Sequence, residues 1–261
     1  MDTPATAGEH LRQLRRQAGL SQLDLALITG VSQRHLSCLE TGRAKPSPGT
    51  LQHLLTALET PLEQCNRVFL AAGFAPRYTA TPLAAPAMAA IREAVSHVLH
   101  ANNPAPAILL GSHWEVLAAN ASTGVLLGLV GVTPPMEGLN LLTTLLQPGG
   151  LGDHLINAEE IRTLAWQRAT REALGNPALA ALLASLPAPT HTQLPTEMPP
   201  LVLTRIRSLE GELNFLSTFT TFGMPQDITL TSLRIEHLIP ADEATWQVMR
   251  AAFADYSALV L

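Results

Sequence analysis

Few side chains in this 261-residue chain are aromatic or charged: aromatic residues make up 4% of the sequence, and Asp, Glu, Lys and Arg together make up 14%. Hydrophobic residues make up 47%, which is too many for an intrinsically disordered chain. The length is sufficient for two ordinary domains that each bury a core. The low aromatic content implies that any internal pocket is lined mostly by aliphatic side chains.

Cysteine is also scarce, with Cys38 and Cys65 the two in the chain. Their spacing and context favour neither a disulfide nor a zinc site. The sequence contains no G-x-S-x-G, no H-E-x-x-H and no phosphate-binding loop, and its nine histidines are scattered. We therefore expect a protein that is not an enzyme, with no catalytic residue, no metal site and no obligate cofactor.

Long apolar runs are missing as well. The longest, such as residues 124–132, are too short and too broken by glycine to cross a bilayer. Met1 is followed by acidic and small residues, without the basic and apolar regions of a signal peptide. These absences predict a cytoplasmic protein with no membrane partner.

The charge is unevenly distributed along the chain. The formal net charge is −5, but residues 1–75 carry seven Lys or Arg against six Asp or Glu, and residues 76–261 carry nine against fifteen. Residues 12–45 are the most basic, with six cations against Asp24 and Glu40. Attraction to phosphate is therefore plausible near the N-terminus, and the small number of cations favours binding to DNA as a dimer.

Residues 21–42, SQLDLALITGVSQRHLSCLETG, have the pattern of two short helices joined by a tight turn. Gly30 can adopt the left-handed turn conformation, and Ser32 can cap the second helix. In that helix Leu36 and Leu39 face inward. The residues left on its outward face are Gln33, Arg34, Ser37 and Cys38.

This outward face suits a helix that lies in a DNA major groove. Gln can bond adenine bidentately and Arg can bond guanine. We therefore expect Gln33, Arg34, Ser37 and Cys38 to contact bases of double-stranded DNA. The alternative is an αα-hairpin that binds no nucleic acid.

The run LRQLRRQAGLSQLDLA, followed by GVSQRHLSCLETGRAKPS, resembles the phage-repressor-type (Xre-like) helix-turn-helix family. The resemblance covers roughly residues 8–73 and implies an all-α domain of five helices. It implies an internal ion pair between Arg15 and Glu40, and binding of a homodimer to a pseudo-palindromic operator. The positions that it implies for phosphate contacts are Gln22, Ser32, Arg43 and Lys45.

Domain boundaries follow from changes in pattern. We assign residues 1–75 to the helix-turn-helix domain, residues 76–103 to a linker and connecting helix, and residues 104–261 to a second domain. The connecting helix, predicted over residues 88–99, either caps the second domain or forms a dimer contact.

The second domain begins with two short apolar runs, residues 107–110 and 114–119, which predict paired strands before a helix capped by Asn120. Helices are also predicted over residues 141–146, 158–174 and from Asp242 or Thr245 onward. Three later strands are predicted from β-branched and aromatic content, at residues 201–208, 213–222 and 228–238.

The opening of this domain, PAPAILLGSHWEVLAANASTGVLLG, resembles the MmyB-like ligand-binding domain that follows repressor-type DNA-binding domains. The resemblance implies an α+β, PAS-like fold, with an antiparallel sheet and helices that enclose a small-molecule cavity. Two features depart from the family: the compact GLSQLDLA stretch and the proline-rich residues 187–200.

We expect a pocket for a fatty-acid-like or other apolar effector between the sheet and helices 141–146 and 158–174. Each candidate side chain would also suit an ordinary core, and Asn120 would equally serve as a helix cap. A carboxylate on the ligand would call for an arginine such as Arg162, Arg205 or Arg207. The candidate pocket residues are Trp114, Asn120, Leu142, Leu145, Arg162, Trp166, Phe215 and Phe219.

Together these patterns predict a DNA-binding transcription regulator whose C-terminal domain senses a small, apolar molecule. The competing hypothesis is a DNA-binding antitoxin or bridging factor whose C-terminal domain binds a protein partner. A broad exposed apolar patch on the C-terminal sheet would favour that alternative.

Overall fold

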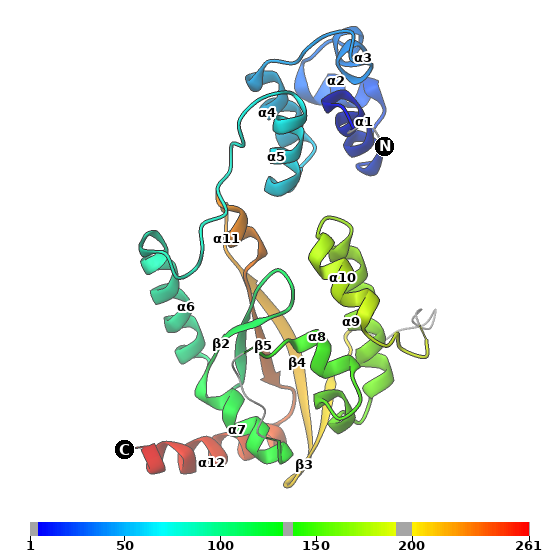
Figure 1. Ribbon diagram of the computed structural model, residues 1–261. Helices are drawn as coiled ribbons and strands as arrows, with labels where there is room; N and C mark the ends of the chain where they lie inside the picture. The colour runs from blue at the N-terminus through cyan, green and yellow to red at the C-terminus, as the bar shows by residue number, and fades with distance from the viewer. Residues whose placement is uncertain (1–4, 133–137, 192–199, 261) are drawn as a thin grey trace. The chain divides into compact units, whose positions relative to one another are not determined.

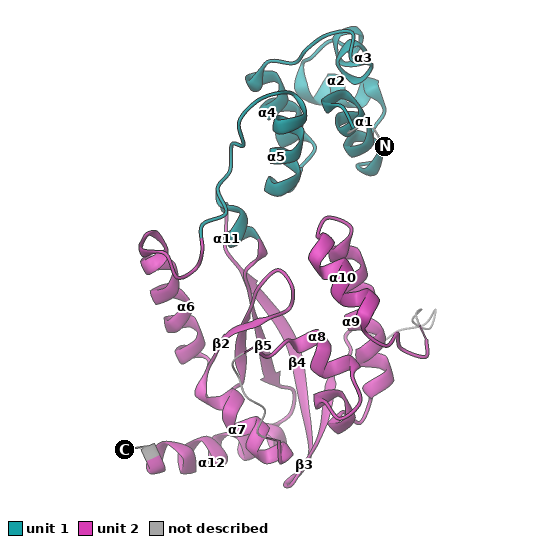
Figure 2. Cartoon of the chain, in the orientation of Figure 1, with its two compact units in different colours: residues 1–81, 224–231 teal, residues 82–223, 232–261 magenta. Residues whose placement is uncertain are grey.

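The computed structural model describes residues 5–132, 138–191 and 200–260 (Figure 1). The chain divides into two compact units (Figure 2). The first contains residues 1–81 together with 224–231, and the second contains residues 82–223 and 232–261. No helix among the described residues is long and apolar enough to cross a membrane.

Five helices form most of the first unit, and each begins where the sequence supplies a suitable cap. Ser21 and Ser47 each accept a hydrogen bond from a backbone N–H in the first turn of the helix that follows. Gly30 ends the second helix at φ 67°, in the left-handed region. The helices are α1 (Ala7–Gln17), α2 (Gln22–Thr29), α3 (Gln33–Glu40), α4 (Pro48–Ala57) and α5 (Leu62–Ala71).

The core of this unit is aliphatic. Leu36 and Leu39 of α3 are fully buried, as the sequence pattern predicted, and they pack with leucines of α1, α2 and α4 and with Phe69 of α5. This packing directs the opposite side of α3 to solvent. The predicted five-helix domain is therefore confirmed.

A segment remote in sequence completes the first unit. Asp227 accepts hydrogen bonds from the side chains of Thr79 and Thr81 at 2.8 and 2.7 Å, and from the backbone N–H of Thr81 at 3.1 Å. Tyr78, the residue before Thr79, is bonded to α5. The side-chain nitrogen of Asn66 donates to the Tyr78 carbonyl, and the side-chain oxygen of Asn66 accepts the Tyr78 backbone N–H. We call Thr79, Thr81 and Asp227 the Asp227 clasp.

The second unit is built on a five-stranded antiparallel sheet with the strand order β2-β1-β5-β4-β3. The pairing of β4 with β5 sets Phe219 opposite Glu236 and Thr221 opposite Arg234, so these side chains project from one face. The strands are β1 (Ala107–Leu110), β2 (Val116–Ala119), β3 (Thr204–Ser208), β4 (Gly211–Thr221) and β5 (Arg234–Pro240).

Helices cover both faces of this sheet (Figure 1). Helix α6 packs on β1 through Val95 and Leu99, so it covers the second unit, one of the two roles that its sequence left open. Helices α8, α9 and α10 lie over the face that carries Phe219 and Glu236. The bounds are η1 (Pro86–Met88), α6 (Ala89–Ala101), α7 (Ala121–Val130), α8 (Leu141–Leu146), η2 (Leu151–His154), α9 (Ala158–Ala173), α10 (Pro177–Ser185), α11 (Ile228–Ser232) and α12 (Glu243–Val260).

The α+β fold is thus confirmed, but two local predictions were wrong. The strand predicted over residues 228–238 begins only at Arg234, because α11 occupies Ile228–Ser232. The carboxylate of Asp227 caps this turn by accepting the backbone N–H of Thr229, a local bond that outweighs β propensity.

Helix α10 was not predicted, although Asn176 and Pro177 supply its cap and its first residue. Residues 192–199 of the proline-rich segment lie outside the described part of the chain.

Asn120 joins three parts of the second unit. Its Oδ1 accepts the backbone N–H groups of Ala107 and Thr123, and its Nδ2 donates to the carbonyls of Leu99 and Ala105. Both ends of the buried amide are therefore satisfied by β1, α6 and α7.

We expect Asn120→Ala to destabilise the second unit by about 2–4 kcal/mol, since it removes a helix cap and leaves buried backbone groups unpaired. Asn176→Ala removes the cap of α10 and one hydrogen bond to the carbonyl of Ser112; it is the control and should cost about 1–2 kcal/mol. Urea denaturation followed by tryptophan fluorescence measures both, because all three tryptophans lie in the second unit. Equal effects of the two substitutions would contradict the central role of Asn120.

Candidate functional site

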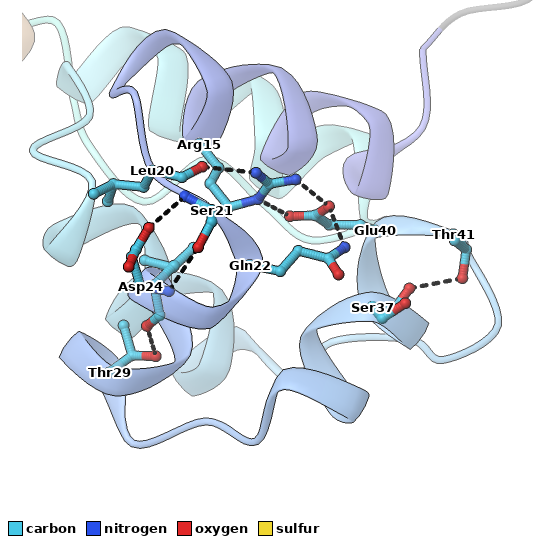
Figure 3. Close-up of polar contacts among 10 residues, drawn as sticks. Arg15, Leu20, Ser21, Gln22, Asp24, Thr29, Ser37, Glu40 and Thr41 are labelled. Carbon is cyan, nitrogen blue, oxygen red and sulfur yellow. Dashed lines mark hydrogen bonds and ion pairs between the residues drawn. The ribbon is translucent and has the colours of Figure 1, made fainter.

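A buried ion pair fixes the helices that carry the predicted DNA-binding face. The guanidinium of Arg15 in α1 donates from Nε and Nη2 to the two carboxylate oxygens of Glu40 in α3, at 2.6 and 2.9 Å. Its Nη1 donates to the carbonyl of Leu20, and Gln22 of α2 donates to Glu40 at 2.9 Å (Figure 3). Every guanidinium nitrogen of Arg15 therefore has a partner.

The electrostatics of this pair favour its charged form. Burial would raise the pKa of Glu40, but hydrogen bonds from Arg15 and Gln22 and the charge of Arg15 hold that pKa below its ordinary value. The hydrogen bond to Glu40 likewise raises the pKa of Arg15. The side-chain amide of Gln22 already donates one N–H to Glu40. Its second N–H is the one left to donate to the phosphate predicted for this position.

The outward face of α3 presents the predicted base-reading residues. Gln33 and Arg34 are exposed, whereas Ser37 and Cys38 are half-buried. Ser32 caps α3 by accepting the backbone N–H of His35. Gln33 and Arg34 therefore lie at the exposed N-terminal end of α3, and Ser37 and Cys38 follow one turn further along, which suits a helix that lies in a major groove.

The loop after α3 carries the two cations predicted to hold phosphates. Arg43 and Lys45 are both exposed, and within the described residues neither forms an ion pair. The same is true of Arg34 on α3. The first unit thus presents unneutralised cations on α3 and on the loop that follows it, which is the charge that phosphate binding requires.

In the second unit, charged residues are buried beneath helix α9. Arg234 of β5 is 8% exposed, and its Nη1 lies 3.3 Å from Glu172 of α9. Glu172 also accepts the indole N–H of Trp114 at 2.8 Å and the Nε of Arg168 at 2.8 Å. One carboxylate is therefore shared by two guanidinium groups and an indole.

Aromatic rings hold both guanidinium groups in place. Arg168 lies 3.9 Å from the ring centroid of Phe219, and Arg234 lies 4.8 Å from that of Trp114.

Glu236, two residues beyond Arg234 on the same face of β5, accepts the hydroxyl of Ser217 at 2.6 Å. Burial raises the pKa of Glu236, against the effects of Ser217, Arg168 and Arg234, and so favours its neutral acid. We call Trp114, Arg168, Glu172, Phe219, Arg234 and Glu236 the inner charge cluster.

The other pocket residues predicted from the sequence separate into groups. Leu142 is fully buried against α9 and α10, and Leu145 and Trp166 pack half-buried beside it. Phe215 is fully buried in a neighbouring cluster with Met249 of α12. Arg162 does not face these residues with a free guanidinium: it binds the carbonyl of Leu145 and pairs with Asp153.

Sequence reasoning missed Arg168, Glu172, Arg234 and Glu236. A signal was present, because Arg234 and Glu236 are separated by the apolar Ile235, and residues two apart on a strand share one face. Arg168 and Glu172 are likewise four apart on α9, in line with buried Ala165. The pattern alone does not show that these charges are buried, because that depends on whether a helix covers the face of the sheet that carries them.

A separate cleft of about 370 Å³ lies on the opposite face of the sheet, between α6 and strands β1 and β2. Its lining includes Arg92, Val95, Leu99, Leu117 and Asn120. Of the pocket residues predicted from the sequence, Asn120 alone contributes to this lining, and its side chain is used to bind backbone groups.

Comparison with known families matches both units. Residues 91–252 match the family described as MmyB-like transcription regulator ligand binding domain, and residues 6–68 match a helix-turn-helix domain family. Two curated relatives are similar to part of this chain. The uncharacterized HTH-type transcriptional regulator y4dJ of Sinorhizobium fredii is 41% identical over 58 residues, which cover 22% of this chain and 75% of the relative.

The second relative is the uncharacterized HTH-type transcriptional regulator RghRB of Bacillus subtilis. It is 39% identical over 57 residues, which cover 22% of this chain and 41% of the relative. Each of these similarities spans about a fifth of this chain, whereas the match to the ligand-binding family covers residues 91–252.

We expect Glu40→Ala to destabilise the first unit by about 3–5 kcal/mol, because it leaves Arg15 buried without its counter-charge. The pKa of Glu40 is lowered by folding, so the pair contributes its stability above the unfolded pKa and loses it as pH falls through the folded pKa. The difference from wild type should accordingly shrink in acid. Denaturation followed by far-ultraviolet circular dichroism at neutral and acidic pH measures this.

The matched control for that prediction is Glu212→Ala. Glu212 pairs with Arg205 on the surface, where solvent screens both charges, so its loss should change stability little. A cost for Glu40→Ala as small as that of the control would show that the buried pair does not hold α1 and α3 together.

Proposed function

Since this chain belongs to the family of MmyB-like transcription regulators and carries a helix-turn-helix DNA-binding domain, we propose that it is a ligand-responsive regulator that binds a pseudo-palindromic operator as a homodimer. A small, mostly apolar molecule bound in the second unit changes the affinity for that operator. The match of residues 91–252 to a ligand-binding family is the observation that carries the proposal.

Base readout is assigned to the exposed face of α3. Gln33 and Arg34 open that face, with Ser37 and Cys38 one turn further along. Arg43 and Lys45 contact phosphates from the following loop, and Ser32 and Gln22 contact them from the starts of α3 and α2. These roles agree with the exposure of the cations and with the rigid support that Arg15 and Glu40 give to α3.

Dimeric binding follows from the small number of available cations. Residues 1–75 have a surplus of one positive charge, and one copy would neutralise few phosphates. Two copies double the phosphate contacts and read two half-sites, which raises both affinity and specificity.

The ligand is placed against the inner face of the sheet. Leu141, Leu145, Trp166 and Leu182 remain half-buried there although they pack against fully buried neighbours. A chain of roughly ten methylenes would gain a gross ~8 kcal/mol on burial, before the costs of binding. This supports an apolar, fatty-acid-like effector. None of the described residues that line the cleft beside α6 has a buried side-chain polar atom without a hydrogen-bond partner.

The Asp227 clasp offers a route from this site to the DNA-binding helices. Phe219 near the end of β4 and Arg234 at the start of β5 flank the segment that contains Asp227. That segment binds Thr79 and Thr81, and the adjoining Tyr78 binds Asn66 of α5. A ligand that alters the ends of β4 and β5 would thus act on a connecting segment that belongs to the first unit, and this chain connection would link the two sites.

The competing class, an antitoxin or bridging factor, has less support. It calls for a broad apolar surface on the C-terminal sheet, but three of the exposed residues of β4 are Thr218, Thr220 and Thr221. The large hydrophobic side chains exposed on the described strands are Leu117 and Phe219, which belong to the separate strands β2 and β4.

The experiment that tests the proposed function has two parts. Mass spectrometry of the purified protein under native conditions identifies any bound small molecule, and selection from random DNA identifies the operator. Operator affinity is then measured by fluorescence anisotropy with and without that molecule. A protein that binds DNA identically in both states, or that retains a protein partner instead, would refute the sensor function.

We expect Arg34→Ala to weaken binding to the operator by about 1–3 kcal/mol and to relax the preference at one base pair, because a bidentate contact to guanine is lost. Lys45→Ala should weaken binding to all sequences alike and reduce the salt dependence by about one unit. Fluorescence anisotropy with operator and random DNA at several salt concentrations separates the two. Equal losses on both DNAs for Arg34→Ala would remove it from base readout.

We expect Asp227→Ala to uncouple the units. Operator affinity and ligand affinity measured alone should change little, but the effect of ligand on operator affinity should fall below about twofold, against the 5- to 150-fold that is typical of allosteric coupling. Asp255→Ala, an exposed carboxylate of α12, is the control. Full coupling in Asp227→Ala would exclude the clasp as the route.

A further inference from the structure

Helix α12 is packed against the rest of the second unit along only half of its length. Its buried residues, Thr245 and Met249, lie in the first two turns, whereas none of residues 251–259 is buried. Leu259 is 87% exposed and Tyr256 is 41% exposed. Figure 1 shows this C-terminal half of α12 extending beyond α7. We call residues 251–259 the α12 tip.

The α12 tip is apolar on the side that continues the buried face of the helix. Met249, Phe253, Tyr256 and Leu259 follow one another at intervals of three or four residues, so they lie on one face. The rings of Phe253 and Tyr256 stack with their centroids 6.3 Å apart. A helical segment as short as the tip is marginal in water unless such a face is packed. The exposed stripe therefore indicates a contact that lies outside the helix itself.

The helix cannot bend back to cover its own tip. Helix α12 is continuous from Glu243 to Val260, and it is anchored at the buried Met249. Leu259 therefore lies about 15 Å along the helix axis from that anchor, since each residue of an α-helix rises about 1.5 Å. A rigid helix that carries an apolar face away from its anchor is suited to reach a second molecule.

The cleft beside α6 offers an apolar surface of the opposite curvature. It encloses about 370 Å³, and its lining includes Val95 and Leu99 of α6 and Leu117 of β2. Leu117 is 43% exposed, and β2 is an edge strand of the sheet. The cleft can thus accept side chains that protrude from another helix.

The charges of the cleft and of the α12 tip are also opposite. Arg92 and His100 line the cleft, and no Asp or Glu is among its described lining residues. Bonds from Nη1 to the carbonyls of Leu83 and Ala85 hold Arg92 in place. Asp255 is the one charged side chain in residues 251–259, and the negative end of the helix dipole lies there as well. This complementarity selects the α12 tip of another copy as the occupant of the cleft.

We propose that the α12 tip of one copy docks in the cleft beside α6 of a second copy, which returns the same contact. The inference rests on the proposed function, which calls for a homodimer, and it names the surfaces that form that homodimer. A two-fold axis makes the exchange reciprocal, so both tips and both clefts are covered in one closed dimer. Helix α6 then has both roles that its sequence left open, because it covers β1 and also contacts the partner.

The first test is the dissociation constant of the dimer, measured on the full-length protein by analytical ultracentrifugation. We expect Leu259→Glu to raise that constant at least about tenfold, because a charge enters an apolar contact. Leu117→Glu, in the cleft, should have a similar effect. Far-ultraviolet circular dichroism checks that each variant is folded.

The matched control is Leu174→Glu. Leu174 is 86% exposed, almost the same as Leu259, but it ends α9 and does not line the cleft. We expect this variant to change the dissociation constant of the dimer by no more than about twofold, as for an ordinary surface substitution.

A reversal of charge tests which surfaces meet. Asp255→Arg should weaken the dimer, because it sets a third cation against Arg92 and His100 of the second copy. Adding Arg92→Asp to the same chain should restore part of the affinity, since each reciprocal contact then regains opposite signs. A general loss of helix stability in Asp255→Arg would show no such rescue.

Cross-linking tests the exchange between copies directly. Two proteins, each with Cys38→Ser and either Leu259→Cys or Leu117→Cys, are mixed with a size tag on one of them; Cys65 is buried and is retained. We expect mild oxidation to link the two different variants to each other more readily than either variant to itself.

The outcomes separate this inference from the proposed function. A dimer that survives both Leu259→Glu and Leu117→Glu, or a disulfide that links the Leu259→Cys variant only to itself, overturns the docking of tip and cleft and leaves the proposed homodimer intact. A wild-type protein that remains monomeric overturns both the docking and the homodimer. The response of operator binding to the co-purified molecule then tests the sensor function separately.

Discussion

The cost of burying a guanidinium group governs both units of this protein. An arginine that leaves water must have its charge neutralised and its N–H groups bonded, or it destabilises the fold by several kcal/mol. In the first unit Glu40, Leu20 and the supporting Gln22 meet that requirement for Arg15, and the ends of α1, α2 and α3 are fixed as a result. The rigid α3 that follows is what presents Gln33 and Arg34 to solvent.

In the second unit the same requirement is met only in part. Glu172 satisfies one nitrogen of Arg234, and Trp114 lies against the plane of its guanidinium. Burial correspondingly lowers the pKa of Arg234, opposed by Glu172. An apolar side chain of similar volume would often be at least as stable at such a position, so Arg234 contributes little net stability to the second unit.

The order of elements along the chain places a segment of the first unit between two strands of the second. Strands β4 and β5 carry Phe219 and Arg234 on one face, and the segment that joins these strands contains Asp227. Because Asp227 is bonded to Thr79 and Thr81, a segment distant in sequence becomes part of the first unit. The first unit therefore contains a segment from the connection between β4 and β5.

The first unit was largely determined by its sequence, because its signals are local. Capping by Ser21, Ser32 and Ser47, the turn at Gly30 and the spacing of Leu36 and Leu39 each act within one or two helical turns. The second unit depends on pairing between distant strands, so only its outline could be predicted. The sequence proposed Arg162 as a partner for an acid, but the tertiary structure engages Arg162 with Asp153 and Leu145. Which arginine is buried beneath α9 is decided by the register of β4 on β5, a non-local property that no window of sequence contains.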